Sequence, residues 1–475
     1  MPETFLHGVQ VLEVDTGSRP IRTVRSSVIG LVGTGNSDGT LSSVEVGGTN
    51  SKIKYTAVPE GVAGDAISVA TTKPSGNNAT LTVTVSGNVI SVSLATDGSA
   101  AATSTASQVI AAVNLNADAA ALVTASLGTG SNGSGVAATG TVALGGGVNP
   151  TFPLDRPVLV TSPTGIDDAL GADTYLGKAL EAIYKQAGAV VAVVRTADVV
   201  GAATEMTGGY ALKRAQADLG YVPRIIVMEG SGDDSGVTDT IKAVADSLRA
   251  VAVVGIDSGT EPLATNATDW MDNNGNERTY AIWPFTNGGE DPAPHVAGLI
   301  AKSDNERGFW WSPSNQELFG ITSLDKPVDF QLGDPTSLAN VLNEGKVTTF
   351  IRQGGFRLWG NLTGSIDAKW QFLSVRRTAD IINDSILANH LWAVDRNITK
   401  TYLEDVAAGV NGYLATLVSL GAIIGGRCWP DPDLNSPANI ALGKVYFNFE
   451  FTPPYPAQTV TFRSILTNDY LTELV

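Results

Sequence analysis

Histidine most often carries acid–base and metal chemistry near neutral pH, and this chain has three: His7, His295 and His390. None has a second histidine four residues away, the spacing that places two imidazoles on one helix face in zinc proteases. Cys428 is the single cysteine, so neither an intrachain disulfide nor a multi-cysteine metal site can form. The sequence predicts no metal and no cofactor.

Residues 293–301, Ala-Pro-His-Val-Ala-Gly-Leu-Ile-Ala, resemble the histidine segment of subtilisin-like proteases. Such an enzyme also needs an activated serine and an orienting carboxylate. The Gly-Thr-Ser-Met-Ala nucleophile segment of that family is absent. We therefore interpret this segment as a helix that begins near His295, and we predict that the chain is not an enzyme.

Sites for phosphates and cations are equally poorly supported. No Gly-x-x-x-x-Gly-Lys-Ser/Thr loop occurs, and Asp38 occupies the position of the third glycine in the fingerprint-like run 33–38. The acidic clusters at 233–234 and 431–433 lack the spacing of a calcium loop, and we interpret them as solvated loops.

Length and composition limit the class of protein. A chain of 475 residues with 43% hydrophobic residues is long enough for two to four domains. The net charge of -17 and the pI near 4.6 oppose binding to nucleic acid or to an anionic membrane. The most apolar windows fall short of the ~20 residues needed to cross a bilayer, and the opening lacks a secretory signal pattern. We expect the protein to fold in the cytoplasm.

The composition changes after Gly35. Residues 36–149 contain little charge and much Gly, Ala, Ser, Thr and Val, which predicts a separate small β-rich or α+β domain. Alternation over 81–85 and 89–94, with a turn between them, indicates a hairpin. The Ala-rich stretch 106–127 predicts a helix, and 141–144 a closing strand.

From residue 152 the pattern alternates between helix and strand. Continuous Val and Ile runs such as 190–194 and 251–256, separated by helical segments, predict a covered, largely parallel sheet. A long helix is expected over 368–393, and a period-2 strand over 444–452. The predicted fold class is therefore α/β and α+β, multidomain, with a mixed sheet, flanking helices and an inserted β-rich domain.

Several segments, in order, are similar to the contractile tail sheath family of phages and phage-like injection particles. These are the opening 5–11, 19–24 and 26–33, the continuation 152–160, the central 295–301 with 304, 307–310 and 312–315, and finally 355–360 with 375–378. The resemblance covers about residues 1–35 and 150–475. It implies four parts: an N-terminal arm and first core strand (1–35), an inserted outer domain (36–149), an α/β domain (150–350), and a C-terminal tube-proximal α+β domain with its own arm (351–475).

The family resemblance implies a structural role in a virion. Copies of the chain would form hexameric rings stacked helically around an inner tail tube, with baseplate and tail terminator proteins as further partners. The sleeve would be assembled in the host bacterial cytoplasm, and its contraction would drive the tube through the target cell envelope. An α/β hydrolase, a nucleotide-binding enzyme and another virion tail assembly protein remain the alternatives.

Two surfaces are expected to carry this assembly. The resemblance implies terminal arms that add strands to a neighbour's sheet, and the β-rich terminal segments suit that role because exposed strands pair with other chains. The residues expected to pair are Val9, Val11, Val14, Val445, Phe447, Phe449 and Phe451. The alternative is ordinary edge strands in the chain's own sheet. A basic cluster on the long helix, Lys369, Arg376 and Arg377, is expected to contact an acidic tube; internal ion pairs of Arg376 and Arg377 are the alternative.

Overall fold

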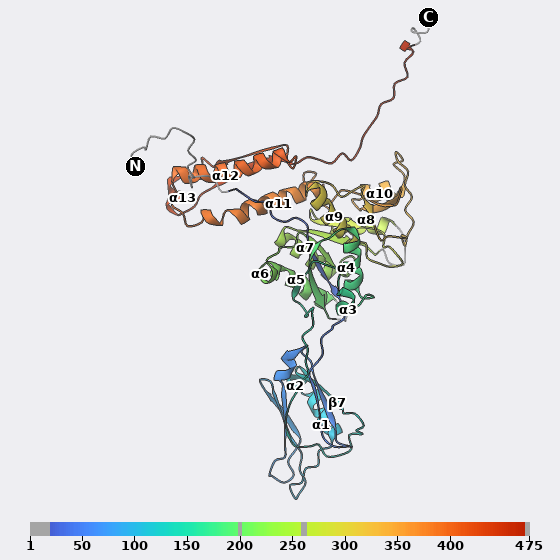
Figure 1. Cartoon of the computed structure of the whole chain (residues 1–475), viewed down its shortest axis with the longest axis vertical. Coiled ribbons are helices and arrows are strands. Elements are labelled where there is room, and N and C mark those ends of the chain that lie inside the picture. The colour runs from blue at the N-terminus through green and yellow to red at the C-terminus, as the bar shows by residue number, and fades with distance from the viewer. Residues whose placement is uncertain (1–19, 198–201, 258–263, 471–475) are drawn as a thin grey trace, which may run out of the picture.

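The computed structural model describes residues 20–197, 202–257 and 264–470, arranged as Figure 1 shows. A central α/β body carries a separate unit, residues 36–149, at its lower end. Two helices between residues 373 and 419 run across its upper end. The C-terminal segment leaves the molecule as an extended tail (Figure 1). The multidomain α/β and α+β fold predicted from the sequence is confirmed.

The body is built on a six-stranded sheet with the order β13-β12-β11-β1-β10-β9. Strands β13 to β10 are parallel and β9 is antiparallel to β10, which confirms the predicted mixed sheet. The strands are β1 (Val28–Thr34), β9 (Pro157–Val160), β10 (Val190–Thr196), β11 (Ile225–Met228), β12 (Val251–Gly255) and β13 (Thr279–Ile282).

Helices cover both faces of this sheet, because successive side chains of a strand point to opposite faces and both sets are apolar here. Ile29 and Leu31 of β1 join the core formed with α4 (Tyr175–Gln186) and α9 (Ala293–Arg307). Val32 joins the core formed with α7 (Ser235–Leu248). The smaller helices of the body are α3 (Ile166–Leu170), α5 (Ala202–Ala211), η2 (Leu212–Arg214) and α6 (Ala215–Leu219).

Residues 36–149 have a hydrophobic core of their own, whose members all lie between Ile53 and Leu144. Two sheets, β2-β3-β7 and β5-β6-β4-β8, pack with α1 (Ala106–Leu115). The predicted hairpin is confirmed as β5 and β6. The other elements are β2 (Ser43–Val46), β3 (Ile53–Ala57), η1 (Val62–Ala66), β4 (Ser68–Thr72), β5 (Thr82–Ser86), β6 (Val89–Ser93), α2 (Ala117–Ala120), β7 (Val123–Leu127) and β8 (Gly140–Ala143).

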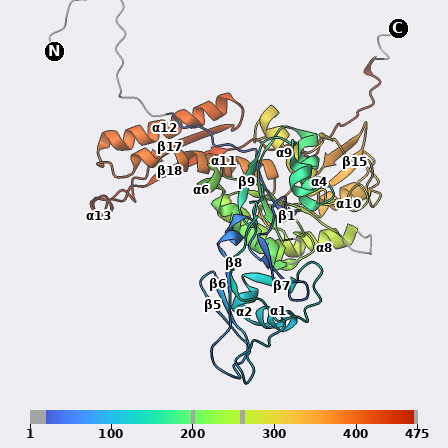
Figure 2. The ribbon, with the colours of Figure 1, turned by 60° about the horizontal axis from the view of Figure 1, so that its bottom comes forward.

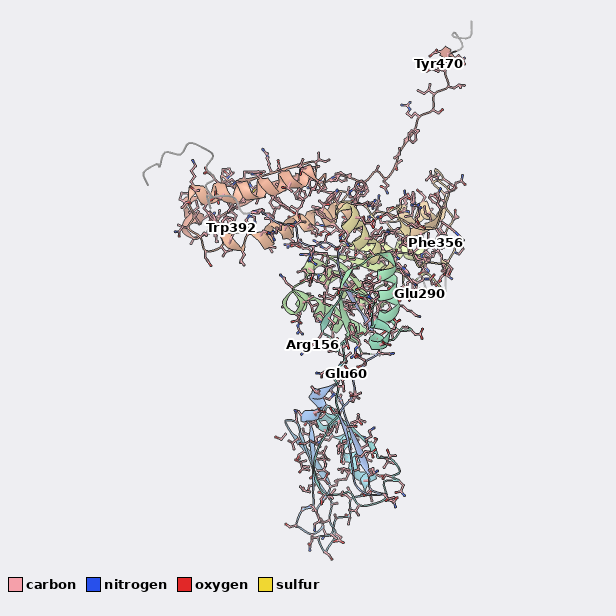
Figure 3. The ribbon with its side chains drawn as sticks, in the orientation of Figure 1. Glu60, Arg156, Glu290, Phe356, Trp392 and Tyr470 are labelled. Atoms are coloured by element: carbon pink, nitrogen blue, oxygen red, sulfur yellow. The ribbon has the colours of Figure 1, made fainter. Side chains whose placement is uncertain are left out.

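The two linkers of this unit lie side by side. Thr40 and Val148 form a β-bridge, and the Asp38 carboxylate accepts a hydrogen bond of 2.8 Å from the Thr151 backbone N–H. Glu60, at the junction in Figure 3, forms an ion pair of 2.5 Å with Arg195 at the end of β10, and Arg195 is 2% exposed. A buried charge of the body is thus neutralised by the inserted unit.

The C-terminal unit consists of α11 (Leu373–Asn389), α12 (Lys400–Ser419) and a hairpin of β17 (Gly425–Pro430) and β18 (Phe447–Thr452), which lies beside α12 (Figure 2). These elements share one hydrophobic core. The remaining elements are α8 (Ala264–Asn274), β14 (Glu317–Leu318), α10 (Leu338–Glu344), β15 (Thr349–Arg352), β16 (Phe356–Trp359), η3 (Leu391–Ala393) and α13 (Pro437–Ala441). None of the helices in the described ranges combines the length and hydrophobicity that a transmembrane span requires.

Two predicted helices are shorter than expected. The stretch 106–127 breaks at Asn116 into α1 and the short α2, and residues 123–127 form β7, because pairing with β3 outweighs the helix propensity of alanine. The helix expected over 368–393 runs from Leu373 to Asn389. Lys369 precedes it in a turn, where its backbone N–H donates to Oδ1 of Asp367 at 2.9 Å.

Candidate functional site

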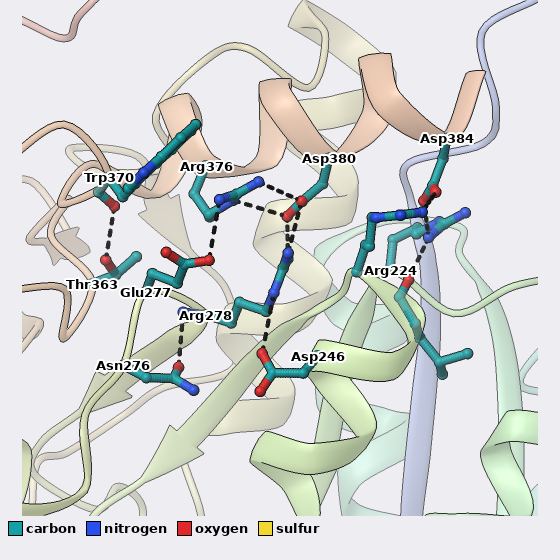
Figure 4. Close-up of polar contacts among 12 residues, drawn as sticks. Arg224, Asp246, Asn276, Glu277, Arg278, Thr363, Trp370, Arg376, Asp380 and Asp384 are labelled. Carbon is teal, nitrogen blue, oxygen red and sulfur yellow. Dashed lines mark hydrogen bonds and ion pairs between the residues drawn. The ribbon is translucent and has the colours of Figure 1, made fainter. Parts of the chain in front are cut away.

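One face of α11 carries charged residues at helical spacing, and this face is turned toward the α/β body. Arg376, Asp380 and Asp384 are four residues apart, so they lie on one side of the helix. Arg377 lies next to them and is also buried. We call these four residues and their partners on the body the ionic seam (Figure 4).

Asp380 is the centre of the seam. Its carboxylate accepts hydrogen bonds from Arg376 Nη2 at 2.7 Å and from Arg278 Nη2, at the start of β13, at 2.9 Å. Arg376 also bonds Glu277 at 3.1 Å and stacks on the ring of Trp370, 4.2 Å from its centroid. Two arginines therefore share one buried carboxylate and fix α11 to the edge of the sheet.

Two further groups of buried ion pairs join α11 to the body. Arg377 donates to the two carboxylate oxygens of Asp304 on α9, each at 2.6 Å. Asp384 pairs with Arg224, which precedes β11, and with Arg249 Nη1 at 2.5 Å. Buried charges of this kind are costly unless paired, so every member depends on its partner.

These contacts correct the predicted tube contact. Arg376 is 8% exposed and Arg377 is 5% exposed, and both guanidinium groups are bound within the chain. The alternative of internal ion pairs is therefore the right one for these two residues, which cannot present their charge to a tube in this conformation. Lys369 is exposed and lies before the helix, so its role in tube contact stays a prediction.

The predicted pairing strand is found at 447–452 and is bound within the chain along one edge. Phe447, Phe449 and Phe451 oppose Pro430, Cys428 and Gly426 of β17 and pack against the C-terminal core. Val445 precedes the strand, so it does not take part in this pairing. Val9, Val11 and Val14 lie outside the described residues.

The hairpin leaves one edge uncovered. Asn411 of α12 forms hydrogen bonds of 2.7 and 2.8 Å to the backbone of Cys428, which satisfy the outer edge of β17 at that residue. Among the described residues the sheet has two strands, so the outer edge of β18 carries no strand. An uncovered edge is a template for a further strand from another chain.

The tail after β18 supplies a segment able to form such a strand. Tyr455 packs edge-on against Phe372, with ring centroids 5.9 Å apart. Beyond it the tail extends from the molecule to Tyr470 (Figure 3). Its apolar side chains are largely exposed: Val460 66%, Phe462 91%, Ile465 81%, Leu466 96% and Tyr470 72%. This exposed segment lies further along the chain than the pairing strand predicted at 444–452, and it includes the alternating residues Val460, Thr461 and Phe462.

The side chains of His295 and Cys428, two residue types that often carry chemistry, are both buried in the structure. His295 is 2% exposed and its Nδ1 lies 3.2 Å from Nε2 of Gln186, while burial lowers the pKa of His295 to about 4. Burial raises the pKa of the Cys428 thiol, which favours the protonated form. Within the described ranges no group of three or more His, Cys, Asp and Glu side chains is arranged to hold a metal ion.

The comparison with known proteins decides the family. The phage tail sheath protein central domain matches residues 203–363, and the phage tail sheath C-terminal domain matches residues 365–467. A putative prophage major tail sheath protein of Pseudomonas aeruginosa is 39% identical over 341 residues, which cover 67% of this chain and 88% of that protein. The chain belongs to the phage tail sheath proteins.

Other sheath proteins agree with this assignment. The tail sheath protein of Escherichia phage P2 is 30% identical and covers 68% of this chain and 88% of its own length. The tail sheath protein of Burkholderia phage BcepMu is 29% identical over 100% of this chain and 99% of its own length. The sheath fold is shared with the contracted sheath of an extracellular contractile injection system, at a TM-score of 0.54 and 16% identity over 67% of this chain and 89% of that one. The chain is therefore a structural protein of a contractile phage tail.

Proposed function

We propose that the chain polymerises as stacked hexameric rings around an inner tail tube, and that contraction of this sleeve drives the tube through the envelope of the target cell. The observation that carries the proposal is the exposed apolar tail, residues 453–470, together with the outer edge of β18, on which no strand lies among the residues the structure describes. A tail that buries few of its apolar side chains within its own molecule gains most by pairing with another.

Strand addition between copies would then connect the sleeve. The tail of one copy, and the N-terminal segment 1–19 of another, would extend the hairpin of β17 and β18 in a neighbour. Phe447, Phe449, Phe451 and Val460 are the residues that we expect at these pairings, with Val9, Val11 and Val14 in the N-terminal segment. Val445 lies too early in the chain to belong to β18.

Contraction needs no nucleotide in this scheme, because an extended sleeve that is metastable releases energy when its copies reach a better-packed arrangement. The ionic seam supports movement as one body, since it ties α11 to the α/β body through buried ion pairs. We infer that the chain acts without catalysis.

The partners follow from this role. We propose that the tail tube protein contacts the C-terminal unit, with Lys369 as one contact, and that baseplate and tail terminator proteins hold the ends of the sleeve. Residues 36–149 would face outward, away from the tube. Assembly would take place in the host bacterial cytoplasm and yield a component of the virion.

A truncation tests the proposal. The full chain should form striated hollow cylinders in negative-stain images, and a chain that ends at Thr452 should remain a folded monomer. Deletion of residues 1–19 should likewise abolish the cylinders. Cylinders of normal length from either truncated chain would contradict the proposed strand addition.

A matched pair of point variants sharpens this test. Phe462→Asp places a charge on the apolar face of the tail, whereas Thr461→Asp places the same charge on the opposite face of an extended strand. We expect the first to prevent polymerisation and the second to permit it.

A further inference from the structure

A broad groove of about 770 Å³ lies where the C-terminal unit meets the α/β body. Residues 22–25 form one wall, and the C-terminal half of α11 forms another. The loop 220–224 before β11 and the end of α7 complete it. The groove therefore opens at the amino ends of β1 and β11.

The groove is basic in a strongly acidic protein. Arg22, Arg25, Arg224 and Arg249 line it, and Asp384 is the one carboxylate among the residues that line it. Asp384 already pairs with Arg224 and Arg249. Arg22 and Arg25 are exposed, so their charges are available to a partner.

The arginines of the groove differ in how far their charge is available to a partner. The Arg25 guanidinium lies 5.1 Å from the ring centroid of Tyr221, which holds it over the opening. Arg224 is 8% exposed and its Nη1 is held by Asp384 (Figure 4), so the charges that can meet a partner are those of Arg22 and Arg25.

An acidic surface lies at the opposite end of the same strands. Asp233 and Asp257 are exposed, and they follow β11 and β12 at their carboxyl ends. Asp234 caps the amino end of α7, whereas Arg249 caps its carboxyl end. We call Asp233, Asp234 and Asp257 the acidic edge. The length of α7, ~20 Å at 1.5 Å per residue, separates the acidic edge from the groove.

We propose that the basic groove of one copy binds the acidic edge of a second copy. The inference rests on the proposed function, because it assigns one of the contacts between copies in the sleeve. Opposite charges at opposite ends of one body favour a head-to-tail contact, and a contact of that kind continues from copy to copy into rings or helical filaments. The overall charge of -17 makes a basic surface the natural complement of the chain's own acidic one.

Charge reversal in the full chain tests this pairing. The groove variant is Arg22→Glu with Arg25→Glu, and the edge variant is Asp233→Lys with Asp257→Lys; Asp234 is left unchanged because it caps α7. Each variant alone should weaken self-association at least about tenfold, since like charges would face each other. An equimolar mixture should recover it, because each variant then meets its complement. Sedimentation velocity measures the association.

The control is Arg156→Glu with Arg352→Glu, two exposed arginines outside the groove with the same change in net charge. It should associate like the unmodified chain. A groove variant that also does so would overturn the proposal, and so would a mixture that fails to recover while both variants keep their circular dichroism spectra. If the unmodified chain does not associate, the proposed function itself fails, and this inference with it.

Discussion

Arg377 and Asp304 are 73 residues apart in sequence and form a buried two-point ion pair, with both N–O distances at 2.6 Å. The pair joins α11 to α9. The sequence predicted the helix that carries Arg377 but not which way the Arg377 side chain faces. A basic residue on a helix has the same local sequence pattern whether it faces solvent or a carboxylate that is distant in sequence.

Arg377→Ala should lower the free energy of unfolding by about 3–5 kcal/mol, because it leaves Asp304 buried without its partner. Urea denaturation followed by circular dichroism measures the change. Lys400→Ala is the control: it removes an exposed pair with Glu404 at 3.7 Å and should leave the midpoint within experimental error. If both changes lowered the free energy of unfolding equally, the buried ion pair would contribute no more to stability than the exposed one.

Gly298→Ala tests the contact between α4 and α9. A Cβ at Gly298 would lie 2.8 Å from the carbonyl oxygen of Ile183, so the helices must separate, at about 1–3 kcal/mol. The control is Gly412→Ala on α12, where a Cβ has no neighbour within 4 Å. Alanine favours the helix there, which should raise stability by roughly 0.5–1 kcal/mol. Opposite signs in thermal unfolding are expected, and equal signs would be inconsistent with this packing.

Glu60→Ala should loosen the inserted unit from the body. Arg195 is then a buried cation without a carboxylate, and we expect a loss of about 1–3 kcal/mol. Hydrogen exchange should speed up in the linkers 36–42 and 145–151 while the core of the unit stays protected. Glu45→Ala, which removes a half-buried pair with Lys52 inside the unit, is the control and should leave the linkers unchanged. Unchanged linkers in the Glu60 variant would mean that this ion pair does not hold the unit.

The buried imidazole of His295 should make stability depend on pH. Its pKa is about 4 in the folded chain and near 6.5 when unfolded, so only the unfolded chain binds the proton between these values. Stability relative to His295→Gln should therefore fall as the pH decreases from 6.5 to 4, by up to about 3 kcal/mol.

The comparison with the variant is needed because a carboxylate acts in the opposite direction. Burial raises the pKa of Asp291 to about 6, so this group favours the folded chain as the pH falls through 6. Denaturation of both proteins at several pH values separates the two effects. A constant difference between them would exclude His295 as the source.

Replacing residues 36–149 by a short Gly-Ser linker should leave the rest of the chain folded. The cores on either side share no members, and the bridge between Thr40 and Val148 brings the two ends together. The cylinders should persist with a smaller outer diameter in electron micrographs. An unfolded body, or cylinders of unchanged diameter, would contradict an outward-facing unit.

The sequence correctly predicted those elements whose hydrophobic pattern fits one kind of secondary structure. The Val runs at 190–194 and 251–256 became buried strands because a covered parallel strand is apolar on both faces. The helix predicted over 106–127 was wrong for 123–127, because pairing with β3 makes these residues a strand. The ion-pair partners of α11 could not be predicted from the sequence, because they lie in three separate elements that only the fold brings together. These partners are Arg224, Arg278 and Asp304.

If the tail after β18 pairs with a neighbour as we propose, its length limits how far copies of the chain can move apart. Pro453, Pro454 and Pro456 stiffen its first residues, so it leaves the hairpin in a set direction. Residues 453–470, fully extended, span at most about 60 Å. In the proposed sleeve, a connection of that length would let two neighbouring bodies move by tens of ångströms relative to each other while the paired strands stay bound.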